Sequence, residues 1–71
     1  MEFTVIVHPD ETGGYWTEVP VLPGCGSQRE SIEEAIDMTR DAIQGYLASL
    51  KKHGETIPDE SRVVYKVTVP V

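Results

Sequence analysis

The residues of this chain that could carry out chemistry are a group of acids, two histidines and one cysteine. The acids that lie close together in the sequence are Glu33, Glu34, Asp37 and Asp41. Carboxylates that converge from strands and a helix can hold two metal ions for hydrolysis of a phosphodiester. Such convergence is not predicted, because Val5 and Ile6 are apolar and residues 62–71 contain no acid. We expect the four acids to form a solvated helix face, and we predict no catalytic residue.

The histidines and the cysteine form no recognisable motif for metal binding or nucleophilic catalysis. His8 and His53 have no cysteine or acid at the spacing of a metal site. Cys25 has no base beside it in the sequence, and although His8 could approach it in space, nothing else supports a thiol nucleophile. As the only cysteine, it permits no intramolecular disulfide, which fits the reducing cytoplasm. No metal or other cofactor is expected.

A long amphipathic helix over residues 32–53 would position the four acids. Ser31 and Glu34 have the spacing of a capping box, and Gly54 followed by Pro58 ends the helix. Residues suited to a packed face recur at three- and four-residue spacing. They are Ile32, Ala35, Ile36, Thr39, Ala42, Ile43, Tyr46, Leu47 and Leu50. One face of this helix is therefore predicted to pack on a sheet.

Two strands are expected to form a hairpin ahead of the helix. Residues 3–7 are rich in β-formers, and residues 9–14 include two glycines that permit a tight reversal. Residues 15–19 form the second strand. Its inward residues are predicted to be Tyr15, Thr17 and Val19, because the other choice would bury the carboxylate of Glu18. Trp16 then points away from the helix.

Two further strands are expected, one before the helix in the sequence and one after it. Pro20 and Pro23 remove backbone donors and Gly24 allows a positive φ, so the second strand ends in a tight corner. Residues 25–29 are predicted as a brief third strand. Residues 62–69 alternate and are predicted as the last strand. Its inward residues would be Val63, Tyr65, Val67 and Val69, with Val64, Lys66 and Thr68 outward.

Size and charge indicate a small domain that binds another protein. The 71 residues carry a formal charge of -6, which disfavours nonspecific attraction to nucleic acid and favours a basic partner. A chain this short buries only about 60% of its unfolded surface, so self-association as a homodimer or homotetramer is expected. No apolar run is long enough for a membrane span. We expect one domain, residues 1–71, located in the cytoplasm.

One apolar side chain from each of three strands is predicted to face away from the helix. These are Ile6, Trp16 and Val64, which favour a patch for protein contact, either with a second copy or with a different protein. A base-stacking surface for RNA is the alternative, with Trp16 as platform and Lys66 and Arg62 as cations. The alternative is less favoured because binding of RNA usually needs more positive charge.

Several motifs occur together in an order that resembles the HicB-type antitoxin domain of bacterial toxin–antitoxin pairs. They are Gly14-Tyr15-Trp16, Glu18-Val19-Pro20, Leu22-Pro23-Gly24-Cys25, Glu33-Glu34-Ala35 and Gly54-Glu55-Thr56-Ile57-Pro58. The resemblance implies an α+β fold of the order βββαβ, a partial ribonuclease H-like sheet in the order 3-2-1-4. It also implies a HicA-type toxin partner that cleaves messenger RNA and is neutralised when its active surface is covered. Many such antitoxins continue into a DNA-binding segment, whereas this chain ends at Val71, so direct DNA binding is not expected.

The resemblance leaves two candidate surfaces for the toxin. The first is the second strand, where Trp16 and Glu18 point the same way and offer an aromatic anchor and an acid. The second is the third strand with its following turn, where Gln28 and Glu30 are polar. At that turn the family usually carries a Gly-Asp/Glu-Thr step, whereas Arg29 here places a cation beside Glu30. The second strand is therefore preferred. A solitary homo-oligomer of the same fold, without a toxin, is the alternative function.

Overall fold

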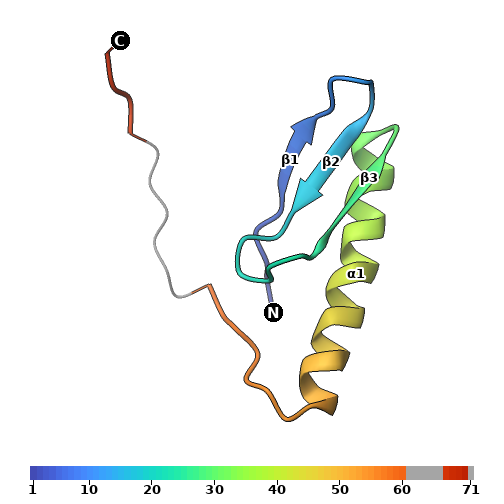
Figure 1. Cartoon of the computed structure of the whole chain (residues 1–71), viewed down its shortest axis with the longest axis vertical. Coiled ribbons are helices and arrows are strands. Elements are labelled where there is room, and N and C mark those ends of the chain that lie inside the picture. Colours follow the sequence, from blue (N-terminus) through green and yellow to red (C-terminus); the bar gives the residue numbers. More distant parts are fainter. Residues whose placement is uncertain (61–66, 71) are drawn as a thin grey trace.

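The computed structural model of this chain describes residues 1–60 and 67–70. Its elements are β1 (Ile6–Pro9), β2 (Tyr15–Glu18), β3 (Gly26–Arg29) and α1 (Ile32–Lys52). The three strands form an antiparallel sheet in the order β1-β2-β3, and α1 runs along one face of it, in contact with β3 and β2 (Figure 1). This arrangement confirms the predicted α+β class, the three strands ahead of the helix and the helix itself.

The first strand begins at Ile6, later than the residue 3 that the sequence predicted. In the observed register Ile6 lies opposite Glu18, the last residue of β2. The Val19 N–H faces β3, where it binds the Cys25 carbonyl (3.2 Å), and the next residue that could donate toward β1 is Pro20, which has no N–H. The start of β1 is therefore set by a proline on the neighbouring strand.

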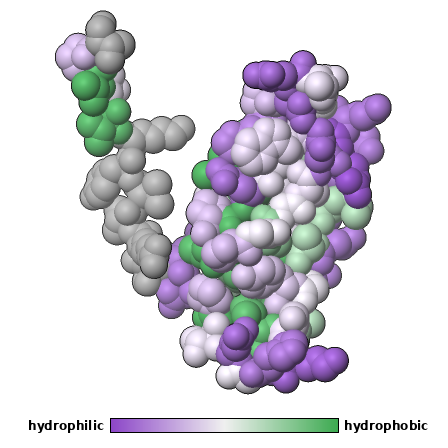
Figure 2. Space-filling model, viewed as in Figure 1, coloured by the Kyte–Doolittle hydropathy of each residue, from purple (hydrophilic) through white to green (hydrophobic). Residues whose placement is uncertain are grey.

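The corner after β2 forms the centre of a small core. Gly24 has a φ of +82°, as the turn requires, and the Cys25 N–H binds the Leu22 carbonyl at 3.0 Å. Leu22 is completely buried and packs with Val19 and Cys25. Partly buried residues around them are Phe3, Val5, Val21, Ala42, Ile43, Tyr46, Leu47 and Leu50. The core is too small to enclose every apolar residue, and Figure 2 shows hydrophobic surface in the middle of the body between hydrophilic ends.

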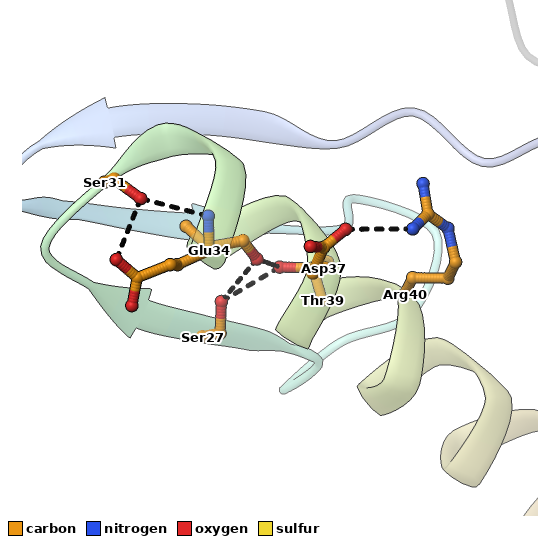
Figure 3. Close-up of polar contacts among 7 residues, drawn as sticks. Ser27, Ser31, Glu34, Asp37, Thr39 and Arg40 are labelled. Carbon is orange, nitrogen blue, oxygen red and sulfur yellow. Dashed lines mark hydrogen bonds and ion pairs between the residues drawn. The ribbon is translucent and has the colours of Figure 1, made fainter.

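Three hydroxyl groups, those of Thr17, Ser27 and Thr39, join β2, β3 and α1 beneath the sheet; Figure 3 shows the two from β3 and α1. The Ser27 N–H donates to Thr17 Oγ1 (2.9 Å). The Thr17 hydroxyl donates to Thr39 Oγ1 (2.5 Å), because the proton of the Thr39 hydroxyl is used in a bond to the Ala35 carbonyl. The Thr39 hydroxyl in turn donates to the Ala35 carbonyl (2.6 Å), which also accepts from Ser27 Oγ (2.9 Å). Thr17 and Thr39 are buried, and each of their hydroxyls both accepts and donates. This hydroxyl relay holds α1 at a fixed position on the sheet.

Both ends of α1 have the predicted caps. Ser31 Oγ accepts from the Glu34 N–H and also lies 3.1 Å from Glu34 Oε1 (Figure 3). The Glu34 side chain thus pairs with the Ser31 hydroxyl rather than with the backbone N–H of a standard capping box. At the other end His53 is the C-cap, and Gly54 follows with a φ of +70°. Ile32 was predicted on the packed face but is exposed. It is the first residue of α1, and burial begins only at Ala35, three residues later.

The predicted last strand falls partly outside the described residues. Its residues 62–66 cannot be assessed, but residues 67–70 form no strand, and Val67 and Val69 are 79% and 66% exposed. The prediction that these two valines face inward is wrong, because residues 67–70 lie apart from the sheet and helix (Figure 1). Within the described residues the sheet has three strands. The carboxylate of Glu60 accepts hydrogen bonds from the Thr4 N–H and hydroxyl just ahead of β1.

We predict that Thr17→Val destabilises the fold more than Thr39→Val does. Loss of the Thr17 hydroxyl leaves the Ser27 N–H without its acceptor, which should cost about 1–3 kcal/mol. Loss of the Thr39 hydroxyl costs less, because Thr17 can donate instead to Ser27 Oγ, 3.2 Å away. Urea unfolding of both variants measures the difference, with Thr17→Ser as the control that keeps the hydroxyl. A larger loss for Thr39→Val would contradict the proposed direction of the relay.

Candidate protein-binding face

The face of the sheet that points away from α1 carries the predicted binding residues. Thr17 is buried against the helix, so its neighbours Trp16 and Glu18 point to the opposite side. The register places Ile6 opposite Glu18, and His8 and Gln28 on either side of Trp16. We call Ile6, His8, Trp16, Glu18 and Gln28 the outer sheet face. Trp16 is 40% and Ile6 39% exposed, which confirms the predicted outward direction of both.

His8, Trp16 and Glu18 form a compact cluster on this face. The rings of His8 and Trp16 are stacked, with centroids 4.0 Å apart and an angle of 16° between their planes. His8 Nε2 lies 2.9 Å from Glu18 Oε1. Because a carboxylate only accepts, His8 donates from Nε2 in this pair. One histidine therefore fixes both the indole ring and the carboxylate.

A second acid lies at the tip of the β1–β2 hairpin. Gln28 Nε2 donates to Asp10 Oδ2 at 2.5 Å, which links β3 to the turn. The Thr12 N–H and hydroxyl both bind Asp10 Oδ1 and hold the pKa of that carboxyl below its ordinary value. Arg29 Nη1 donates to the Gln28 carbonyl at 2.5 Å. Asp10 stays ionised at neutral pH and adds negative charge beside the outer sheet face.

The structure brings together three of the four predicted partner-binding residues. Trp16, Glu18 and Gln28 share the outer sheet face, while Glu30 is exposed between the end of β3 and the start of α1. Of the predicted oligomer patch, Ile6 and Trp16 share this face, and Val64 lies outside the described residues. Sequence reasoning missed the contacts of His8 with Trp16 and Glu18. Pairing the two strands across the turn at Gly13 and Gly14 would have placed His8 opposite Trp16.

The candidates for catalysis do not meet in one place. Cys25 is buried in the core, and burial raises the pKa of its thiol, whereas His8 lies on the outer sheet face. Glu33, Glu34, Asp37 and Asp41 are exposed on α1, where Asp37 pairs with Arg40 at 3.1 Å (Figure 3). In residues 1–60 and 67–70 no group of three histidines, cysteines or acids could hold a metal ion.

A separate groove of about 430 Å³ lies between the N-terminal segment and α1. Its lining is apolar except for Arg40 and Gln44, so it lacks the converging polar groups of a small-molecule site. The apolar residues around it are Met1, Phe3, Val5, Ile36, Ile43 and Leu47.

None of the helices in the described part of the chain has the length and apolar character that crossing a membrane requires.

Comparison with known proteins gives a consistent result. A family profile described as "HicB_like antitoxin of bacterial toxin-antitoxin system" matches residues 3–70. A UPF0150 protein of Thermoplasma acidophilum is 46% identical over 61 residues, covering 86% of this chain and 88% of that protein. A UPF0150 protein of Synechocystis is 35% identical over 69 residues, covering 97% of this chain and 87% of that protein. The crystal structure of the N-terminal domain of Burkholderia pseudomallei antitoxin HicB aligns with a TM-score of 0.77 at 38% identity, covering 89% of this chain and 74% of that one.

We predict that His8→Ala frees the Trp16 ring, while His8→Phe keeps it in place. Loss of the stacked pair should cost about 0.5–1.5 kcal/mol beyond the buried area. Trp16 is the only tryptophan, so the emission maximum and anisotropy of intrinsic fluorescence report on this ring alone. His8→Phe preserves stacking but removes the contact with Glu18. Equal fluorescence changes in the two variants would show that stacking does not hold the ring.

Proposed function

The chain belongs to the HicB_like antitoxin family of bacterial toxin-antitoxin systems, and we propose that it binds and neutralises a HicA-type toxin that cleaves messenger RNA. It acts as a single domain in the cytoplasm and covers the active surface of the toxin. It contributes no catalytic residue and no cofactor. The observation that carries this proposal is a family match over nearly the whole chain, combined with an acidic, aromatic surface that the fold leaves exposed.

The chemistry of the outer sheet face suits a basic protein partner. Trp16 and Ile6 offer exposed apolar area, and Glu18 and Asp10 supply negative charge next to it. The chain as a whole carries a formal charge of -6. A ribonuclease that binds RNA needs a basic surface, and complementary fields raise the association rate and select the partner. An anchor residue such as Trp16 then supplies much of the binding energy.

We favour the outer sheet face over the third-strand turn as the toxin contact. Trp16, Glu18 and Gln28 lie side by side across β2 and β3, and hydrogen bonds fix Glu18 and Gln28. Ordered side chains lose less conformational entropy on binding than mobile ones. Glu30 is exposed and lies beyond the last paired residue of β3, so it serves at most as a rim residue.

A homodimer or homotetramer without a toxin is the second candidate. Its support is the small core and the exposure of Ile6 and Trp16, with Val64 proposed as the third member of the patch. An RNA-binding module has less support. Trp16 is the single exposed aromatic ring of the outer sheet face, and the negative charge of the chain opposes phosphate binding.

We also propose a fourth strand from residues 62–69 beside β1, which would give the order 3-2-1-4 of a partial ribonuclease H-like sheet. Two features support this strand. Residues 62–69 alternate between apolar and polar side chains, and no other described strand pairs with the outer edge of β1. Its formation would require residues 67–70, which lie apart from the sheet in this structure (Figure 1), to move against β1.

The toxin contact is tested by charge reversal at the two candidate surfaces. We expect Glu18→Lys to lower affinity for the toxin at least about tenfold and to abolish rescue of cells that express it. Glu30→Lys should still rescue. The toxin is sought as a short basic protein in an adjacent reading frame, and circular dichroism checks that both variants fold. Failure of Glu30→Lys with normal rescue by Glu18→Lys would move the contact to the turn after β3.

Self-association is tested by Trp16→Glu. We expect the wild-type chain to sediment as a dimer or tetramer at tens of micromolar, and the variant to sediment as a monomer, because burying the new carboxylate at the contact is unfavourable. Glu11→Gln, in the exposed hairpin turn, is the control. A monomeric wild-type chain would remove the homo-oligomer proposal, and an oligomeric Trp16→Glu variant would place the contact elsewhere.

A further inference from the structure

We propose that a second copy of this chain inserts Val67 and Val69 into the apolar groove between the N-terminal segment and α1. In a symmetric pair, each copy gives its C-terminal segment, residues 67–70, to the other and receives one in return. The exchange rests on the fourth strand proposed above and names a second copy as the source of that strand. It does not involve the toxin.

The groove has apolar walls that the described residues leave uncovered. Phe3 and Val5 line it on one side. Ile36, Ile43 and Leu47 line it on the α1 side. All five side chains are only half-buried, so their remaining apolar surface gains free energy when another apolar group removes it from water.

Val67 and Val69 match this groove in spacing and in chemistry. Residues two apart on an extended chain point to the same side, roughly 7 Å from each other, and Phe3 and Val5 have the same separation in the sequence. Both valines are exposed, and residues 67–70 lie apart from the sheet and helix (Figure 1). Gln44, exposed beside the groove, has an amide that can both donate to and accept from a backbone. The groove therefore suits an uncharged, extended apolar segment.

The segment of the same chain starts in the wrong place to fill this groove. The Glu60 carboxylate accepts hydrogen bonds from the Thr4 N–H and hydroxyl, so residue 60 is held beside the N-terminal segment. A strand that continues from there carries Val67 about 23 Å away, at about 3.3 Å per residue. The groove extends only about 17 Å along α1, from Ile36 to Leu47. Val67 of the same chain overshoots it, whereas the segment of a second copy enters without this tether.

Charge and size also favour a second copy. Each copy carries a formal charge of -6, but residues 67–70 are uncharged, and Arg40 at the groove is paired with Asp37 of its own helix. The contact therefore brings no acids together. A chain with a small core gains apolar burial at both ends of the exchange, and exchange of an identical segment is a low-cost route to a dimer.

The first test changes the segment, which is exposed in the single chain. Val67→Asp places a carboxylate in the groove, and we expect the dissociation constant of the dimer to rise at least about tenfold. Thr68→Asp adds the same charge between the two valines, on the opposite side of the segment. This matched control should change the constant by less than about twofold. Sedimentation over a range of concentrations measures both.

The second test identifies the source of the segment with two single-cysteine variants, both made with Cys25→Ala. One carries Val5→Cys and the other Val67→Cys, and the two are mixed at tens of micromolar and oxidised. A disulfide between residues 5 and 67 then joins two chains. We expect it to be at least about fivefold more abundant than a disulfide between residues 5 and 68 in a mixture with Thr68→Cys. Mass spectrometry identifies the linked peptides, and circular dichroism checks the fold.

Three outcomes overturn the exchange. A dimer that tolerates Val67→Asp but is lost in Trp16→Glu places self-association on the outer sheet face. A monomeric wild-type chain that Val67→Asp destabilises toward urea seats the segment on its own body, so the fourth strand stands and the second copy is wrong. Absence of the disulfide, with no effect of Val67→Asp on assembly or stability, removes both. Rescue from the toxin, measured with Glu18→Lys, is independent of all three.

Discussion

The interaction on which the structure depends is the buried hydroxyl relay between the sheet and the helix. Buried hydroxyls are costly unless each finds partners, and Thr17 and Thr39 satisfy this condition in one relative position of β2 and α1. That position fixes which side of β2 faces the helix. Since side chains alternate along a strand, it also directs Trp16 and Glu18 outward. A polar contact in the core thus determines the composition of the outer sheet face.

Patterns in the sequence predicted the elements that depend on local chemistry. The three- and four-residue spacing gave the helix, the Ser31 and Gly54 signals gave its ends, and the cost of burying Glu18 gave the orientation of β2. Features that depend on two segments at once were not predictable in this way. The start of β1 is set by Pro20, and the contacts of His8 follow from the exact register of the hairpin. The exposure of Val67 and Val69 shows that alternation alone does not supply a pairing partner.

The small size of the core connects stability with binding. Few apolar side chains are completely buried, while Ile6 and Trp16 remain partly exposed on the outer sheet face. A partner that covers these residues adds apolar burial that the chain cannot achieve alone, and binding to the folded state raises the free energy of unfolding by mass action. The free chain is then the less stable form, and the complex the more stable one.

The close approach of β3 to β2 at Gly26 also limits how such a protein can diverge. Cells that carry several related antitoxins need each one to ignore the toxins of the others, and such insulation arises when contact residues change. Position 26 cannot take part, because any side chain there would collide with the neighbouring strand. On the proposed contact, new specificities arise through its neighbours, Trp16, Glu18 and Gln28, while position 26 keeps its glycine.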